Sequence, residues 1–182
     1  MRLPARLFRT RPAAHTIGMT FQDHFSTQAD AYARFRPTYP DALYAWLASM
    51  APARELAWDC GTGSGQAAVA LAAHFTRVIA SDPSREQIAH AAVHARVRYV
   101  VASAEQPPAE ALGADLVTVA QALHWFDFAR FYPTLKRVLK PGGLFAAWGY
   151  GLMRILPAVD AIVTRYRMDV VGPYWPPERR HI

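Results

Sequence analysis

Short apolar runs alternate with amphipathic stretches along most of this chain, and the alternation predicts its architecture. After Pro40, the apolar residues Leu43, Trp46, Leu47 and Met50 recur at helical spacing, so we expect a helix with one apolar face there. From residue 56 onward, buried-strand patterns and helical patterns take turns. The expected strands are Leu56–Asp59, Arg77–Ser81, Arg98–Val101, Asp115–Ala120 and Leu144–Trp148, and the expected helices are Gly65–His74, Ser84–Val93, Phe128–Leu139 and Leu156–Val171.

This alternation predicts an α/β fold with a Rossmann-like, doubly wound and mostly parallel sheet, covered by helices on both faces. Right-handed crossovers bring the carboxyl ends of the strands to one edge, and ligands of such sheets bind outside that edge. Asp59, Asp82, Ser103 and Gln121 all fall at expected strand ends. We therefore expect a ligand site where these four residues meet.

The most informative strand end is the loop Asp59-Cys60-Gly61-Thr62-Gly63-Ser64-Gly65-Gln66. Its glycines allow turns at positive φ and let a ligand approach without a Cβ in the way. Dinucleotide loops have the spacing G-x-G-x-x-G and bind pyrophosphate, whereas here the third glycine comes one residue early and Asp59 precedes the turn. A carboxylate repels phosphate but suits a ligand with ammonium and sulfonium groups, as in S-adenosyl-L-methionine. A Walker loop is excluded because no Gly-Lys-Ser/Thr follows.

Asp82 ends the next expected strand, about 20 residues beyond the first glycine. An acid at this offset binds ribose hydroxyls in doubly wound folds. The alternative is that Asp82 is the N-cap of the following helix, with Pro83 at its first position. The glycine loop beside it favours the ribose role.

Several further motifs occur in a fixed order with these two acids. They are Tyr32 with Arg36-Pro37-Thr38-Tyr39-Pro40, Ser103-Ala104-Glu105, Gln121-Ala122-Leu123-His124-Trp125-Phe126 and Leu139-Lys140-Pro141-Gly142-Gly143. With this set, the chain from Phe25 to about Arg180 resembles the class I S-adenosylmethionine-dependent methyltransferases. It is most similar to the small-molecule subgroup with a methyltransferase type 11 domain that includes trans-aconitate methyltransferase.

The resemblance implies roles for the matching residues. It implies that the cofactor is bound by Asp59, Gly61, Thr62, Gly63, Gly65, Gln66, Asp82, Ser103, Ala104, Glu105 and Gln121. Residues Ser103–Glu105 are the implied adenine contact, although many relatives have an acid where Ser103 stands. A lid or substrate-facing role is implied for Tyr32, Arg36, Tyr39, Trp125 and Trp175, with packing as the alternative.

His124 is the catalytic candidate, at the expected mouth of the pocket. It would act as a base toward a hydroxyl substrate or as a hydrogen-bond donor to a carboxylate, and a purely structural histidine is the alternative. Cys60 is expected to be a small buried residue of the loop rather than a nucleophile. His90 and His94 lie four apart on an expected helix, but no third ligand accompanies them, so no metal is expected.

The composition of the chain limits its possible partners and cellular location. The net charge is +6, but residues 1–18 hold four arginines and no acid, and without them the charge falls to +2. We therefore expect no nucleic-acid partner. No apolar run is long enough for a membrane span, and the single cysteine suits a reducing cytoplasm.

The domain organisation expected from the sequence is one methyltransferase domain over residues 19–182. Residues 1–18 are expected to be a disordered or mis-assigned arm, residues 19–50 to form lid helices, and residues 150–182 to begin a truncated substrate cap. The fold of the family usually has two more strands, so we expect its C-terminal strands to be missing. A sheet with an open edge would also suit a homodimer.

These features together predict an S-adenosylmethionine-dependent methyltransferase that O-methylates a small, carboxylate-bearing metabolite. A carboxylate is a nucleophile without a base, and transfer from a sulfonium requires mainly positioning. Three alternatives stay open: a non-catalytic or truncated S-adenosylmethionine-binding protein, a nicotinamide-dependent oxidoreductase, and a nucleic-acid methyltransferase. The second requires a later third glycine and tolerates Asp59 poorly.

Overall fold

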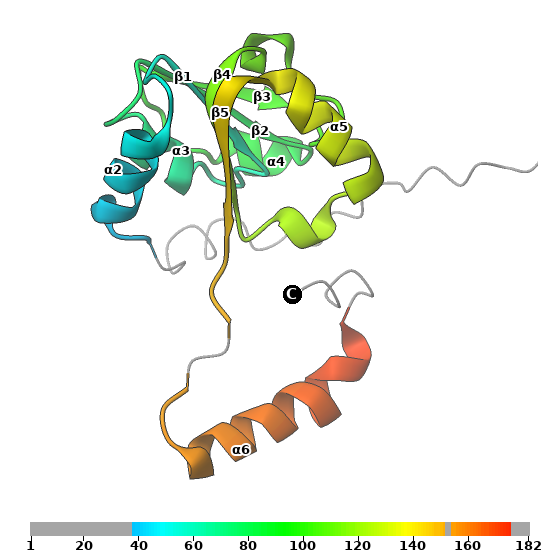
Figure 1. Ribbon diagram of the computed structural model, residues 1–182. Coiled ribbons are helices and arrows are strands. Elements are labelled where there is room, and N and C mark those ends of the chain that lie inside the picture. Colours follow the sequence, from blue (N-terminus) through cyan, green and yellow to red (C-terminus); the bar gives the residue numbers. More distant parts are fainter. Residues whose placement is uncertain (1–37, 152–153, 176–182) are drawn as a thin grey trace, which may run out of the picture.

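Five parallel strands form one sheet in the computed structural model, which describes residues 38–151 and 154–175 (Figure 1). The strand order is β3-β2-β1-β4-β5, and every pairing is parallel. The strands are β1 (Leu56–Cys60), β2 (Arg77–Asp82), β3 (Val97–Val101), β4 (Ala114–Ala120) and β5 (Leu139–Trp148). The helices are α2 (Asp41–Met50), α3 (Gln66–Leu71), α4 (Arg85–Ala89), α5 (Phe128–Val138) and α6 (Pro157–Arg165), with short turns η2 (Ala109–Ala111), η3 (Leu123–Trp125), η4 (Tyr166–Val171) and η5 (Gly172–Tyr174).

The order of the strands places a switch point between β1 and β4. The chain moves outward from β1 to β2 and β3, then returns to place β4 on the other side of β1. In doubly wound sheets the ligand crevice lies outside the carboxyl ends of the strands at this reversal. Asp59 is paired in register with Ala80 of β2 and with Thr118 of β4, so its position in the sheet is central.

Two apolar cores form on opposite faces of the sheet because successive strand residues point to opposite sides. On one face, Ala57 and Leu116 pack against helices α2 and α3. On the other, Trp58 and Val117 pack against α5. The predicted α/β sheet with helices on both faces is therefore confirmed (Figure 1).

The predicted apolar face of the first helix is confirmed at Leu43 and Leu47 but is wrong at Trp46 and Met50. Tyr44, Leu47 and Ala48 are the buried residues of α2, whereas Trp46 and Met50 are each 58% exposed. Tyr44 and Leu47 are three residues apart, and Ala48 follows one turn after Tyr44, so these three share a stripe. The prediction missed the stripe because it counted only aliphatic and tryptophan side chains and left out the partly polar tyrosine.

Several element ends also differ from prediction. Helix α4 ends at Ala89 rather than Val93, so His90 is its C-cap and His94 lies outside the helix. The two histidines therefore do not share a helical face. Strand β5 begins at Leu139, before the predicted turn, because its pairing with β4 jumps from Leu139 to Leu144 around a bulge that contains Gly142 at φ 76°.

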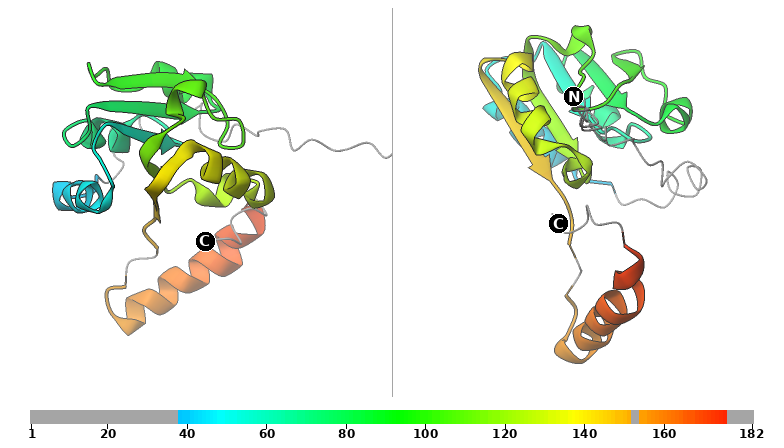
Figure 2. Two further views of the ribbon diagram at one scale, coloured as in Figure 1. Left: turned by 45° about the horizontal axis from the view of Figure 1, so that its top comes forward. Right: turned by 90° about the vertical axis from the view of Figure 1, so that its right-hand side faces the viewer.

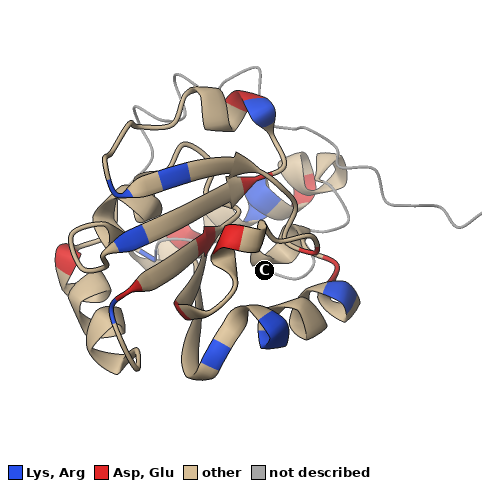
Figure 3. Ribbon diagram, turned by 90° about the horizontal axis from the view of Figure 1, so that it is seen from above, with Lys and Arg blue, Asp and Glu red and all other residues tan. Residues whose placement is uncertain are grey.

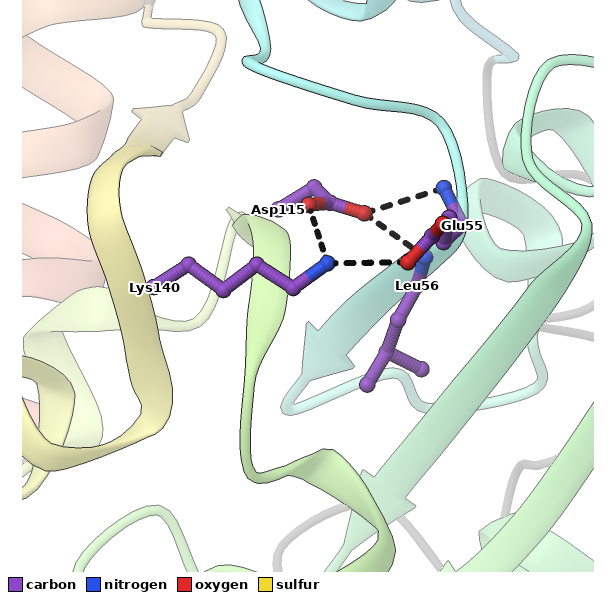
Figure 4. A network of polar contacts seen from close by, with 4 residues as sticks. All are labelled: Glu55, Leu56, Asp115 and Lys140. Carbon is purple, nitrogen blue, oxygen red and sulfur yellow. Dashed lines mark hydrogen bonds and ion pairs between the residues drawn. The ribbon is translucent and has the colours of Figure 1, made fainter.

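An ion-pair network ties together the amino ends of the strands, at the opposite edge from the switch point (Figure 4). The fully buried carboxylate of Asp115 accepts hydrogen bonds from the amides of Glu55 (2.9 Å) and Leu56 (3.0 Å) and pairs with Lys140 Nζ at 2.9 Å. Lys140 also pairs with the Glu55 carboxylate at 3.0 Å. Burial raises the pKa of Asp115, but these bonds outweigh it and hold the pKa below its ordinary value. The network fixes β1, β4 and β5 relative to one another.

Helix α6 lies apart from the sheet in each view (Figures 1 and 2). No residue of α6 is buried, and Ile162 on it is 71% exposed. The prediction of one helix over Leu156–Val171 is close, since α6 continues into a π-helical turn, η4.

Charged residues are interspersed over the part of the chain that the structure describes. Figure 3 shows Lys and Arg on several strands and helices, with Asp and Glu between them. Every helix within residues 38–151 and 154–175 is too short or too polar to traverse a bilayer.

Candidate functional site

The glycine loop between β1 and α3 has the backbone that its sequence predicts. Gly61, Gly63 and Gly65 all have positive φ, at 70°, 56° and 84°. At Gly61 a Cβ would lie 2.7 Å from the Cβ of Ala122, so the turn after β4 packs directly on the loop. The amides of Gly61 and Thr62 both donate to Ser81 O, at 2.8 and 2.9 Å, which ties the loop to the end of β2.

Asp59 lies beneath this loop with a buried carboxylate that is 1% exposed. Its Oδ2 accepts from Thr62 Oγ1 at 2.5 Å, and its Oδ1 accepts from Thr118 Oγ1 at 2.8 Å. Both threonine hydroxyls thus hold the carboxylate in one orientation. Hydrogen bonds from hydroxyls to a carboxylate are short and directional, so the site presents this carboxylate in a defined geometry.

A pocket of about 180 Å³ opens beside this carboxylate. It lies between α2, α3 and the ends of β1 and β4. The described residues that line it include no lysine or arginine. They are Thr38, Tyr39, Tyr44, Asp59, Gly61, Thr62, Ser64, Gln66, Ala67, Val69, Ala70 and Ala120.

Burial and the nearby Asp59 shift the pKa of two tyrosine hydroxyls. Burial raises the pKa of Tyr44 to about 12, and the negative charge of Asp59 adds to the shift. The same two causes raise the pKa of Tyr99 to about 12. Both phenols therefore stay protonated at neutral pH and remain hydrogen-bond donors. Burial likewise raises the pKa of the Cys60 thiol well above its ordinary value, which agrees with the prediction that Cys60 is not a nucleophile.

Asp82, at the end of β2, connects the glycine loop to the turn before α4. Its Oδ2 accepts from the Gly63 amide at 2.9 Å, and its Oδ1 accepts from the Ser84 amide at 2.9 Å. The N-cap of α4 is Ser84, whose hydroxyl accepts from Gln87 N, so the alternative of Asp82 as the N-cap is wrong. A carboxylate oxygen accepts more than one hydrogen bond, and Asp82 is 9% exposed, so a ribose role stays compatible with this geometry.

The turn after β4 brings further predicted residues to the same edge. Gln121 Nε2 donates to the hydroxyl of Tyr39 at 3.2 Å, which joins this turn to the segment before α2. His124 and Trp125 follow in η3, with ring centroids 4.7 Å apart. Neither His124 nor Trp125 lines the pocket itself.

The turn Ser103–Glu105 after β3, predicted to contact adenine, makes contacts that stabilise the fold. Glu105 Oε1 accepts from the Asp127 amide at 3.0 Å, and Glu105 O accepts from Thr134 Oγ1 at 3.3 Å. Ala104 is buried in the core under α5. The turn therefore anchors the start of α5, and its contact with adenine, together with Ser103, stays a prediction.

Of the five predicted lid and substrate residues, only Tyr39 lines the pocket, and the other four, Trp125 included, lie away from it or outside the described part. Tyr32 and Arg36 fall outside the described residues. Trp175 stacks under the guanidinium of Arg167, 4.8 Å from the ring centroid, within the segment that contains α6.

Several site residues were not predicted from the sequence, Thr118 and Tyr44 among them. Thr118 orients Asp59, and Tyr44 lines the pocket. Thr118 had a detectable signal, because it is a polar residue inside the otherwise apolar strand Ala114–Ala120 and faces the same side as Leu116. Tyr44 had none, since an aromatic residue on a helix is usually part of the core.

Comparisons with known proteins agree with this geometry. Residues 58–147 match a family model described as a methyltransferase domain. Over 166 residues the chain is 42% identical to a Dictyostelium discoideum protein named as a methyltransferase, and the match covers 89% of this chain and 63% of that protein. A solved structure from Anaeromyxobacter dehalogenans, described as a type II methyltransferase, is 52% identical with a TM-score of 0.68 and covers 81% of this chain and 63% of its own.

A third comparison concerns the fold alone. A Methanococcus maripaludis structure described as an S-adenosyl-L-methionine-dependent methyltransferase has a TM-score of 0.59 at 21% identity, over 86% of this chain and 78% of its own. This chain spans 63% of the length of each of the first two relatives. The trans-aconitate subgroup stays a prediction.

Proposed function

Since this chain belongs to the class I methyltransferase family, we propose that it transfers a methyl group from S-adenosyl-L-methionine to a small, carboxylate-bearing metabolite. The observation that supports the proposal most is the pocket beneath the glycine loop. It offers a buried, oriented carboxylate at Asp59, and no lysine or arginine is among the described residues that line it. Such a site favours a cation and disfavours a phosphate.

The residues of the site fit the parts of this donor. The pocket of about 180 Å³ is smaller than the ~300–1,000 Å³ typical of whole small-molecule sites, so it suits one end of the ligand. We assign the ammonium of the amino-acid end to this pocket, near Asp59. Asp82, at the end of the neighbouring strand, is then available for the ribose hydroxyls. The two acids follow adjacent paired strands, as an extended ligand along this edge requires.

The chemistry required of the protein is modest. When bound, the sulfonium supplies an activated methyl group, which an acceptor oxygen attacks in line as the carbon–sulfur bond breaks and its electron pair stays on sulfur. The residues of the chain bind, orient and exclude water. The neutral hydroxyl of Tyr44 and the glycine-loop amides do so without adding charge near the pocket.

The acceptor is proposed to enter beside the turn after β4. His124 and Trp125 lie there as a stacked pair, and an imidazole N–H is suited to hold a carboxylate by a hydrogen bond. A carboxylate acceptor needs no general base, since it is already ionised at neutral pH. A hydroxyl acceptor would instead require His124 to take the proton.

Ligand binding tests the donor half of the proposal. S-adenosylhomocysteine should raise the unfolding midpoint in a thermal-shift titration and bind with a stoichiometry of one in calorimetry, whereas NAD should have no effect. Stabilisation by NAD alone would overturn the proposal in favour of an oxidoreductase.

Product analysis tests the acceptor half. The protein is incubated with the methyl-labelled donor and a panel of di- and tricarboxylic acids, with matched alcohols and amines as controls. Methyl esters should form, and they are detected by mass spectrometry. Labelled products confined to the amines or alcohols would contradict a carboxylate acceptor, and donor binding without any product would favour a non-catalytic binding protein.

A further inference from the structure

Gln121 has an unusual backbone for its residue type. Its φ is 58°, and it is the one described residue other than glycine with a positive φ. A residue with a Cβ is destabilised in this left-handed region. Strain of this kind persists where the surrounding contacts enforce it, and it concentrates at functional sites. Gln121 follows the last residue of β4, at the edge where the pocket lies.

The contacts of Gln121 join three separate segments. Its amide donates to Trp148 O at the end of β5, at 2.9 Å. Its side-chain Nε2 donates to the hydroxyl of Tyr39, at 3.2 Å. Its carboxamide also lies against Gly149, where a Cβ would come within 3.2 Å of Oε1. The left-handed turn thus places the carboxamide in a space bounded by the ends of β4 and β5 and the segment before α2.

Tyr39, which this carboxamide contacts, forms part of the wall of the pocket. It lines the same pocket as Asp59. Its ring meets Trp148 edge-on with centroids 5.7 Å apart, and it lies 6.3 Å from Tyr150. Aromatic packing constrains the plane of the Tyr39 ring. The hydrogen bond from Gln121 to the Tyr39 hydroxyl constrains how far the ring extends over the pocket.

We propose that Gln121 is a positioning residue, whose strained backbone turns its carboxamide onto Tyr39 and fixes the tyrosine wall of the donor pocket. The inference rests on the proposed function only for the identity of the ligand. Glutamine is the side chain that this geometry needs. Asparagine tolerates the left-handed region better but is one methylene shorter, so it does not reach the Tyr39 hydroxyl.

Hydrogen exchange on the ligand-free protein tests the contact directly. Gln121→Asn keeps the left-handed turn but shortens the side chain, so the hydrogen bond to Tyr39 is lost. Tyr39→Phe removes only the hydroxyl that accepts this bond. Each should speed exchange in a peptide spanning residues 38–47 by about fivefold, the equivalent of one net hydrogen bond, and the double variant should add nothing. Exchange in a peptide from α5 should be unchanged, and the unfolding midpoint of Gln121→Asn should fall no further than the loss of one hydrogen bond explains.

Three results would overturn the proposal: unchanged exchange in both single variants, additive effects in the double variant, or a fall in the midpoint of Gln121→Asn larger than the loss of one hydrogen bond explains. The last would indicate a general packing role instead of a positioning role.

Calorimetry with S-adenosylhomocysteine then separates this proposal from the proposed function. Both single variants should bind about fivefold more weakly than the natural chain. Unchanged affinity with faster exchange would show that the position of Tyr39 does not affect ligand binding, and this result would also overturn the proposal. A natural chain that does not bind S-adenosylhomocysteine would overturn the proposed function, whereas the exchange experiment would still decide whether Gln121 positions Tyr39.

Discussion

Removing the carboxylate of Asp82 should weaken the fold as well as the ligand site. Asp82→Ala leaves the Gly63 and Ser84 amides without the acceptor that each has at 2.9 Å. An unsatisfied buried amide costs about 1–3 kcal/mol. The Ser84 contact is buried and meets this condition, whereas the Gly63 contact is part-buried and water replaces some of it. We therefore expect the free energy of unfolding to fall by about 2–4 kcal/mol.

Equilibrium urea unfolding at pH 7 measures this loss, as a shift of midpoint with an unchanged slope. Affinity for S-adenosylhomocysteine, measured by calorimetry on the folded variant, should fall by about 1–3 kcal/mol because the variant also lacks the carboxylate that we propose binds the ribose hydroxyls. Asp127→Ala is the matched control. Asp127 accepts from the Ala129 and Arg130 amides at the start of α5, so its removal should cost about 1 kcal/mol of stability and leave the affinity unchanged.

Two results would refute this reasoning. Stability within about 0.5 kcal/mol of the natural chain would show that the amides do not depend on Asp82. A clear loss of stability with unchanged affinity would leave Asp82 a structural residue and refute its ribose role.

Three further predictions concern other parts of the site and the fold. Asp59→Asn keeps the shape held by Thr62 and Thr118 but removes the charge, so calorimetry should show S-adenosylhomocysteine affinity weakened by about 1–3 kcal/mol, and full affinity would contradict the ammonium assignment. Asp115→Asn should lower the free energy of unfolding by about 1–3 kcal/mol at pH 7. The pKa of Asp115 lies below its ordinary value of 3.8, so its contribution is complete above that value and lost as the pH falls through the folded pKa. The gap between variant and natural chain should therefore narrow below about pH 4, and a gap that persists in acid would count against the ion pair. Gly65→Ala should destabilise more than Gly142→Ala in urea unfolding, because both have φ near 80° but only at Gly65 would the Cβ meet the Tyr99 ring, within 2.8 Å of its carbons. Equal losses would show that the clash is absorbed.

The main features of the fold and the site were predictable because they rest on local sequence. Alternation of strand and helix patterns predicted all five strands, and three spaced glycines predicted three residues with positive φ. The end of α4 and part of the buried face of α2 were predicted wrongly. In both cases the outcome depends on which side chains the rest of the molecule covers, and a short window of sequence does not contain that information.

The residues that complete the site come from distant parts of the chain. Thr118 orients Asp59 across 59 positions, and Gln121 contacts Tyr39 across 82. At the opposite edge of the sheet, the ion pair of Lys140 with Glu55 likewise spans 85 positions. No periodicity relates residues so far apart, so these contacts become visible only once the strand order is known.

The sequence by itself determined the class of fold, the glycine loop and the two acids at neighbouring strand ends. Each of these follows from residue type and short-range spacing, through backbone freedom and hydrophobic alternation. Only the tertiary structure decided how the acids are held, which face of α2 closes the pocket and why Gln121 is strained. The order of parallel strands brings distant segments to one edge, and packing at that edge determines which side chains face the ligand and which support the loops.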